Sequence, residues 1–122
     1  MTAEITQPST FQERQAARES NEFSYRSTVD YHGLLSVHVA AQATHSAVLV
    51  TATNIDVLAE WLYVQGGTVT TTDLPSGQTV WTLHTTTWTD SPVKFPVVPV
   101  HLSVVLPSGE SVMHEIRAAV AA

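Results

Sequence analysis

The stretch that decides the fold is residues 46–67, SAVLVTATNIDVLAEWLYVQGG. Its first seven residues, 46–52, are apolar on both sides of an extended chain, which is typical of a strand at the centre of a sheet or one covered on both faces. Thr53 or Asn54 then provides an N-cap, and apolar side chains follow at helical spacing until the Gly-Gly pair at 66–67. The stretch predicts a strand followed directly by a helix.

The residues before this stretch divide into two parts. Residues 33–43 alternate between apolar and polar side chains, as a half-buried strand requires. From Met1 to Arg26 the chain is rich in Gln, Glu, Ser, Thr and Arg, and its few larger apolar side chains make too thin a stripe to hold a helix by themselves. We therefore expect residues 1–26 to form a flexible arm and residues 27–122 to form a single α+β domain.

Two similar segments follow the predicted helix, LPSGQTV at 74–80 and LPSGESV at 106–112. In each segment the proline presets one corner of a tight turn and the glycine supplies a left-handed residue, so both predict β-hairpins. Between them, residues 91–99 contain three prolines. Proline lacks the N–H that a central strand needs, so this segment is expected to be an extended connector along an edge.

The turn of each hairpin fixes the register of its strands. In the first, Leu74 opposes Gln78, which sets Val69 opposite Leu83 and leaves a threonine-rich face on the other side. In the second, the same rule extends a strand to residue 116. It places Val105 and Met113 on the face opposite the presumed core and sets His101 opposite Glu115.

These elements predict an α+β domain with a mostly antiparallel sheet. Six strands and one helix follow the order β-β-α-β-β-β-β, and the helix packs on one face of the sheet. A small open β-barrel with one helix is the alternative.

Charge and composition exclude several functional classes. The chain has no cysteine and a formal net charge of −6. From residue 27 onward only Lys94 and Arg117 oppose seven acidic residues, so too few basic side chains are available for the phosphate contacts of a nucleic-acid-binding protein. No apolar run reaches the length of a membrane helix, and the first residues lack the features of a signal peptide. We expect a cytoplasmic protein.

Histidine is the reactive side chain in surplus, with six copies. No close pair has the spacing of a helical metal motif, but His38, His84 and His101 could converge if their strands are neighbours. They are the candidate metal ligands, and solvent-facing strand histidines are the plain alternative. The serines that precede glycine lie in predicted turns and the carboxylates are scattered, so we predict no catalytic residue and no cofactor.

One helix can cover only one side of a sheet, so the remaining apolar side chains indicate a protein partner or a second copy of the chain. The expected interface residues are Trp61, Tyr63, Val48, Val50, Val105, Met113 and Trp88. The sequence favours a non-catalytic interaction or regulatory protein that acts as a homodimer or as an adaptor. The alternatives are a virion or other assembly subunit with an N-terminal arm, and a small metal- or ligand-binding enzyme that uses the strand histidines.

Overall fold

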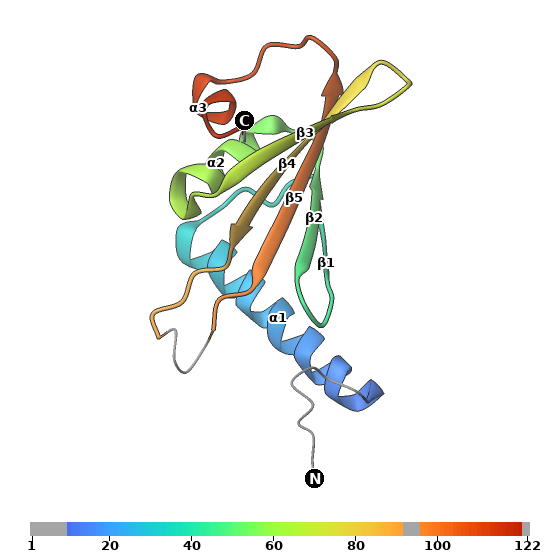
Figure 1. The fold of residues 1–122 in the computed structure, drawn as a ribbon. Helices are drawn as coiled ribbons and strands as arrows, with labels where there is room; N and C mark the ends of the chain where they lie inside the picture. The colour runs from blue at the N-terminus through green and yellow to red at the C-terminus, as the bar shows by residue number, and fades with distance from the viewer. Residues whose placement is uncertain (1–9, 92–95, 121–122) are drawn as a thin grey trace.

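The computed structural model describes residues 10–91 and 96–120. Within these residues the chain forms α1 (Phe11–His32), β1 (Val39–Ala43), β2 (Val48–Ala52), α2 (Ile55–Gln65), β3 (Thr68–Asp73), β4 (Gln78–Thr86), β5 (Pro99–Pro107) and α3 (His114–Ala118). The strands make one sheet in the order β1-β2-β5-β4-β3 (Figure 1). Strands β2 and β5 are parallel, and the other neighbours are antiparallel. The predicted α+β class is confirmed, and the strands form one open mixed sheet and not the alternative small open β-barrel.

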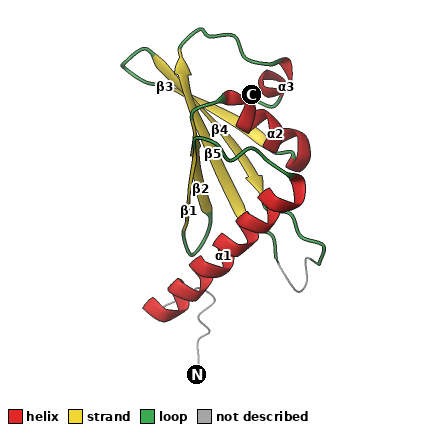
Figure 2. Ribbon diagram, turned by 180° about the vertical axis from the view of Figure 1, so that it is seen from behind, coloured by secondary structure: helices red, strands yellow, loops and turns green. Residues whose placement is uncertain are grey.

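The described helices lie on one side of this sheet (Figures 1 and 2). Helix α1 packs on β1 and β2, α2 packs on β2, β4 and β5, and α3 packs on α2. The core lies between the helices and the facing side of the strands. Its fully buried side chains include Leu58, Trp61, Ile116, Val48, Val50, Val69, Leu83, Val100, Leu102 and Val104.

The deciding stretch folds as its pattern predicts. Strand β2 lies inside the sheet between β1 and β5, and Asn54 begins α2 by accepting a hydrogen bond from the backbone N–H of Asp56 at 2.9 Å. After α2, Gly67 has a φ of 124°, and a Cβ there would lie 2.3 Å from the carbonyl oxygen of His84. A glycine at this position therefore lets β3 start close against β4.

The first hairpin has the predicted register. Val69 lies opposite Leu83 and Thr72 lies opposite Val80. The turn sets this pairing locally, because the N–H of Leu74 donates to the carbonyl of Gln78. A one-residue slip would exchange the two faces of the hairpin.

The expected second hairpin is wrong. Strand β5 has β2 on one side and β4 on the other, so no free edge remains for a strand after the turn at Gly109. The chain instead forms α3, whose Ile116 is fully buried and which packs on α2. The sheet therefore has five described strands, and the expected pair of His101 and Glu115 does not form.

The expectation for the N-terminal part also changes. Thr10 and Glu13 form a reciprocal capping box that starts α1, and Gly33 ends it in the left-handed conformation. The boundary expected after Arg26 thus falls inside a 22-residue helix. The helix is held by contacts made beyond that boundary, among them the Thr28 hydroxyl, which accepts from the backbone N–H of Trp88 at 2.9 Å. Residues 1–9 of the expected arm lie outside the described part.

Candidate functional site

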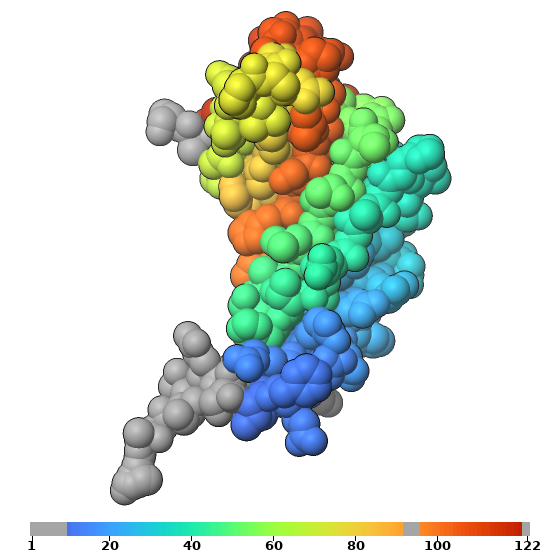
Figure 3. Space-filling view, turned by 90° about the vertical axis from the view of Figure 1, so that its right-hand side faces the viewer, coloured from blue at the N-terminus to red at the C-terminus, as the bar shows by residue number. Residues whose placement is uncertain are grey.

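The described helices leave one whole side of the sheet uncovered. Figure 3 shows the strands of this side next to each other with no helix across them. We call it the open face. The strand register places these side chains on it: Ala40, Gln42, Leu49, Thr51, Thr68, Thr70, Thr72, Gln78, Val80, Thr82, His84, Thr86, His101, Ser103 and Val105. None of them is Asp, Glu, Lys or Arg, although the chain as a whole has a formal net charge of −6.

A row of hydrogen bonds crosses the middle of the open face. His84 and His101 are direct partners on neighbouring strands, and their Nδ1 atoms lie 3.0 Å apart. The Nε2 atom of His84 lies 2.8 Å from the hydroxyl oxygen of Thr70 on β3. Beside this row, the hydroxyl groups of Thr82 and Ser103 bond to each other at 2.9 Å.

The two imidazoles share one proton in this arrangement. A hydrogen bond between two Nδ1 atoms needs one nitrogen to donate and the other to accept. If His84 donates from Nδ1, its Nε2 accepts from Thr70; if His101 donates, the Nε2 of His84 carries the proton and donates to Thr70. The tautomers of the two rings are therefore linked, and their Nδ1 atoms point toward each other.

The predicted histidine cluster is only partly assembled. His84 and His101 come together, but His38 lies in the connection before β1, where it has a φ of 59°. No group of three His, Cys, Asp or Glu side chains in the described residues is arranged to hold a metal ion. The chain alone thus provides two nitrogen ligands, which is fewer than the three or four that zinc takes in proteins.

The two edges of the sheet differ in how their backbone groups are used. At the β3 edge, the N–H of Val69 donates to the carbonyl of Ala119 at 2.9 Å, and Val69 forms a parallel bridge with Val120. At the β1 edge, no described residue pairs with the strand on its outer side. Residues 39–43 also contain no Lys, Pro or other side chain that protects exposed edge strands.

The β1–β2 turn shows which groups the free edge presents. The N–H of Thr44 donates to the carbonyl of Ala47 at 2.7 Å, and hydrogen-bonded pairs alternate with non-bonded pairs along an antiparallel ladder. The backbone groups of Ala40 and Gln42 therefore bond to β2. Those of Val39, Ala41 and Ala43 point outward, unpaired. We call this row the β1 edge.

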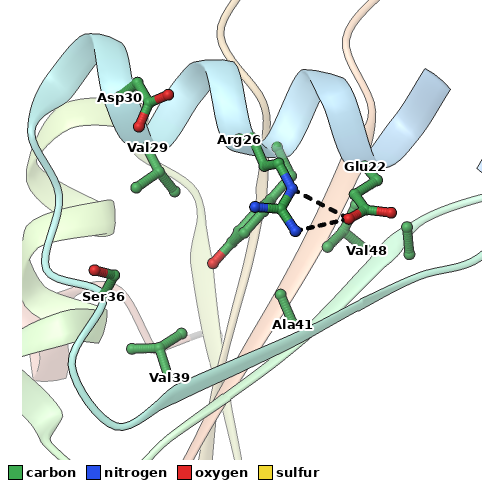
Figure 4. A pocket seen from close by; sticks show the side chains of 10 residues that line it. Glu22, Arg26, Val29, Asp30, Ser36, Val39, Ala41 and Val48 are labelled. Carbon is green, nitrogen blue, oxygen red and sulfur yellow. Dashed lines mark hydrogen bonds and ion pairs between the residues drawn. The ribbon is translucent and has the colours of Figure 1, made fainter. Parts of the chain in front are cut away.

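A cavity of about 370 Å³ lies between α1 and the helix-facing side of β1. Its floor is formed by Val39, Ala41, Ala43 and Val48, and its roof by the α1 residues Glu22, Tyr25, Arg26, Val29 and Asp30, with Ser36 at one end (Figure 4). We call it the α1–β1 groove. Ala41 stays exposed there although it points to the helix side of the sheet, because no helix side chain fills the space above it.

The roof of the groove is acidic. Arg26 forms an ion pair with Glu22 at 2.8 Å, which leaves the carboxylate of Asp30 without an opposing charge among the lining residues. Inside, the ring of Tyr25 stacks on Trp61 with a centroid distance of 5.7 Å. Burial raises the pKa of the Tyr25 phenol above its usual value, and the neighbouring Arg26 partly opposes this effect.

The predicted interface residues do not form one surface. Trp61, Val48 and Val50 are buried in the core of this chain. Val105 lies on the open face, whereas Tyr63, 91% exposed, lies on α2 and Met113 lies before α3. The ring of Trp88 stacks on Tyr31 at a centroid distance of 4.0 Å.

Sequence reasoning missed the groove residues Tyr25, Ala41 and Asp30. One signal was present, because the inward positions of α1 include Tyr25, Thr28, Val29 and His32, which follow helical spacing. This stripe crosses the boundary expected at residue 26, and half of it is polar.

Comparison of the chain with protein-family models, with curated proteins and with solved structures found no match. Among the described helices, none combines the length and the hydropathy needed to cross a bilayer. A function is therefore inferred from the geometry of the open face and of the β1 edge with its α1–β1 groove.

Proposed function

We propose that this protein is an interaction protein that binds an extended segment of a partner protein as an additional strand at the β1 edge. One observation carries the proposal: the same three residues, Val39, Ala41 and Ala43, present unpaired backbone groups at the edge and line the adjacent groove. An added strand would meet both features at once.

The arrangement matches the physical requirements of strand addition. Main-chain hydrogen bonds to a sheet edge supply affinity for any extended peptide, and pockets for alternate side chains supply specificity. Here alternate side chains of the added strand would enter the α1–β1 groove beside Ala41. Its volume of about 370 Å³ lies within the roughly 300–1,000 Å³ of typical binding pockets, so it has room for a few aliphatic side chains.

The charges around the groove define the partner further. With Arg26 engaged by Glu22, the carboxylate of Asp30 favours a peptide that carries Lys or Arg next to its apolar positions. A second copy pairing through its own β1 would bring the same acidic groups toward each other, and each chain carries a formal charge of −6. A basic, extended segment of another protein is therefore the occupant we propose.

The first test is selection of random peptides on the wild-type protein, followed by binding to two variants. Ala41→Pro removes an N–H that points away from the sheet, which edge strands tolerate. Loss of this main-chain hydrogen bond, worth about 0.5–1.5 kcal/mol, is expected to weaken binding by about twofold to tenfold. Thr71→Pro is the matched control, since the alternation from Val69 directs its N–H to the β3 edge, and it should bind like the wild type.

A second measurement is independent of the proline substitution. On addition of a selected peptide, the amide hydrogens of Val39, Ala41 and Ala43 should become protected from exchange, whereas those of Ala40 and Gln42 are already protected by β2. Selected peptides that lack basic residues, that bind Ala41→Pro as well as wild type, or that protect other strands would each overturn the proposal, as would failure to enrich any peptide.

A further inference from the structure

We propose that His84 and His101 form one half of a zinc-binding site on the open face, and that a second copy of this chain completes it. This inference goes beyond the proposed function, because it concerns the opposite side of the sheet and a different ligand. Each chain would contribute two Nδ1 atoms, and a two-fold axis over the pair would assemble four nitrogen ligands around one Zn²⁺.

The distance between the two nitrogens fits a shared ion. Two ligands at about 2.0–2.1 Å from a tetrahedral zinc are about 3.3 Å apart. The Nδ1 atoms of His84 and His101 are 3.0 Å apart, so a small rotation of the rings brings them to that spacing. In the metal-free chain a proton joins them. When the ion binds, the Nδ1 proton is lost to solvent and the Nε2 of the same ring takes up a proton, so both neutral rings hold their proton on Nε2 and bind zinc through the lone pair of Nδ1.

The surroundings support this protonation state. With zinc on Nδ1, the Nε2 of His84 carries its proton and donates to the Thr70 hydroxyl, which is already 2.8 Å away. Such an outer hydrogen bond fixes the tautomer and the ring orientation of a metal-bound histidine. The neighbouring side chains of the open face on β2, β3, β4 and β5 are Leu49, Thr68, Thr82, Thr86 and Ser103, none of which titrates near neutral pH.

The open face suits a second copy. Two chains of formal charge −6 repel each other, but this face lacks charged side chains, so two copies of it can approach without pairing like charges. A sheet of five strands, with about 4.8 Å between strands and about 3.3 Å per residue, gives a face of roughly 500 Å². Two such faces reach the approximately 1,000 Å² that a specific interface needs.

The test uses untagged full-length protein, with zinc or with a chelator, in sedimentation velocity and zinc titration calorimetry. Wild type should change from monomer to dimer with zinc and bind one ion per two chains. His84→Ala and His101→Ala should each remain monomeric. His45→Ala is the matched control, because this histidine is exposed in the β1–β2 turn, and it should dimerise as the wild type does.

Cobalt provides a second readout that does not depend on the alanine variants. Replacing zinc by Co²⁺ should produce the visible absorption of a tetrahedral nitrogen site in the dimer. Three outcomes overturn the inference: no zinc binding, one ion bound per monomer, or zinc-dependent dimers that persist in His84→Ala and His101→Ala. None of these outcomes bears on peptide binding at the β1 edge. Likewise, a failure of peptide binding would not bear on the zinc site.

Discussion

The two faces of the sheet are made by alternate residues of the same strands, yet they differ in burial and in polarity. On β5, Val100, Leu102 and Val104 are 0% exposed beneath the helices. The residues between them, His101 and Ser103, lie on the open face and form side-chain hydrogen bonds with β4. One strand can thus supply the core and a separate polar surface, so substitutions one position apart should have very different consequences.

The largest predicted difference is between two adjacent valines of β5. Val104→Ala removes two methyl groups from a fully buried position and leaves a cavity, which should lower the free energy of unfolding by about 2–3 kcal/mol. Val105 is 45% exposed on the open face, and Val105→Ala should cost less than about 1 kcal/mol. Urea denaturation of the two variants measures both values. Equal losses would show that the open face is covered in solution, for example by a second copy.

The α1–β1 groove is an incompletely filled region of the covered face. Tyr25 lines this groove, and burial raises the pKa of its phenol. A group whose pKa is raised in the folded state stabilises fully below its unfolded pKa of about 10, and this contribution disappears as the pH rises through the folded value.

We therefore expect the wild-type protein to lose stability above about pH 10, the unfolded pKa of tyrosine. Tyr25→Phe keeps the ring on Trp61 but cannot ionise, so its stability should fall less over the same range. Tyr63→Phe is the control, since Tyr63 is 91% exposed. Thermal unfolding of the three proteins at neutral and alkaline pH makes the comparison. Parallel pH curves for all three would mean that Tyr25 ionises as freely in the folded protein as in the unfolded one.

The parts of the fold that the sequence predicts are those fixed by local rules. The turn at Pro75 and Gly77 determines the pairing of β3 with β4, and Asn54 determines the start of α2. The second Leu-Pro-Ser-Gly segment has the same local chemistry but no second strand, because β5 is already paired on both sides. Sheet topology overrode the turn preference there, and topology is not a local property.

Helix α1 and the groove were missed for a related reason. Thr28, fully buried, and Tyr25, partly buried, face the core, but neither belongs to the aliphatic residues that mark an amphipathic helix. The space above Ala41 depends on the path of α1, which no residue of β1 encodes. The outward backbone groups of Ala41 depend on the position of β1 at the edge of the sheet. His84 and His101 form a pair because β4 and β5 are neighbours in the sheet. The sequence predicts polar positions for both histidines but does not determine which strands are neighbours.

The smallest predicted change in stability concerns the open face at Thr70. Thr70→Val removes the hydroxyl that bonds to the Nε2 of His84, while valine keeps the shape and suits a strand. Because the position is exposed, the free energy of unfolding should change by less than about 0.5 kcal/mol. Zinc affinity, measured by calorimetry, should fall by about tenfold to a hundredfold, as for other outer-shell partners of metal-bound histidine. Thr72→Val on the same strand controls for the added methyl group and should bind zinc normally. If Thr70→Val and Thr72→Val bind zinc equally, Thr70 does not orient His84 for the metal, and its hydrogen bond only links β3 to β4.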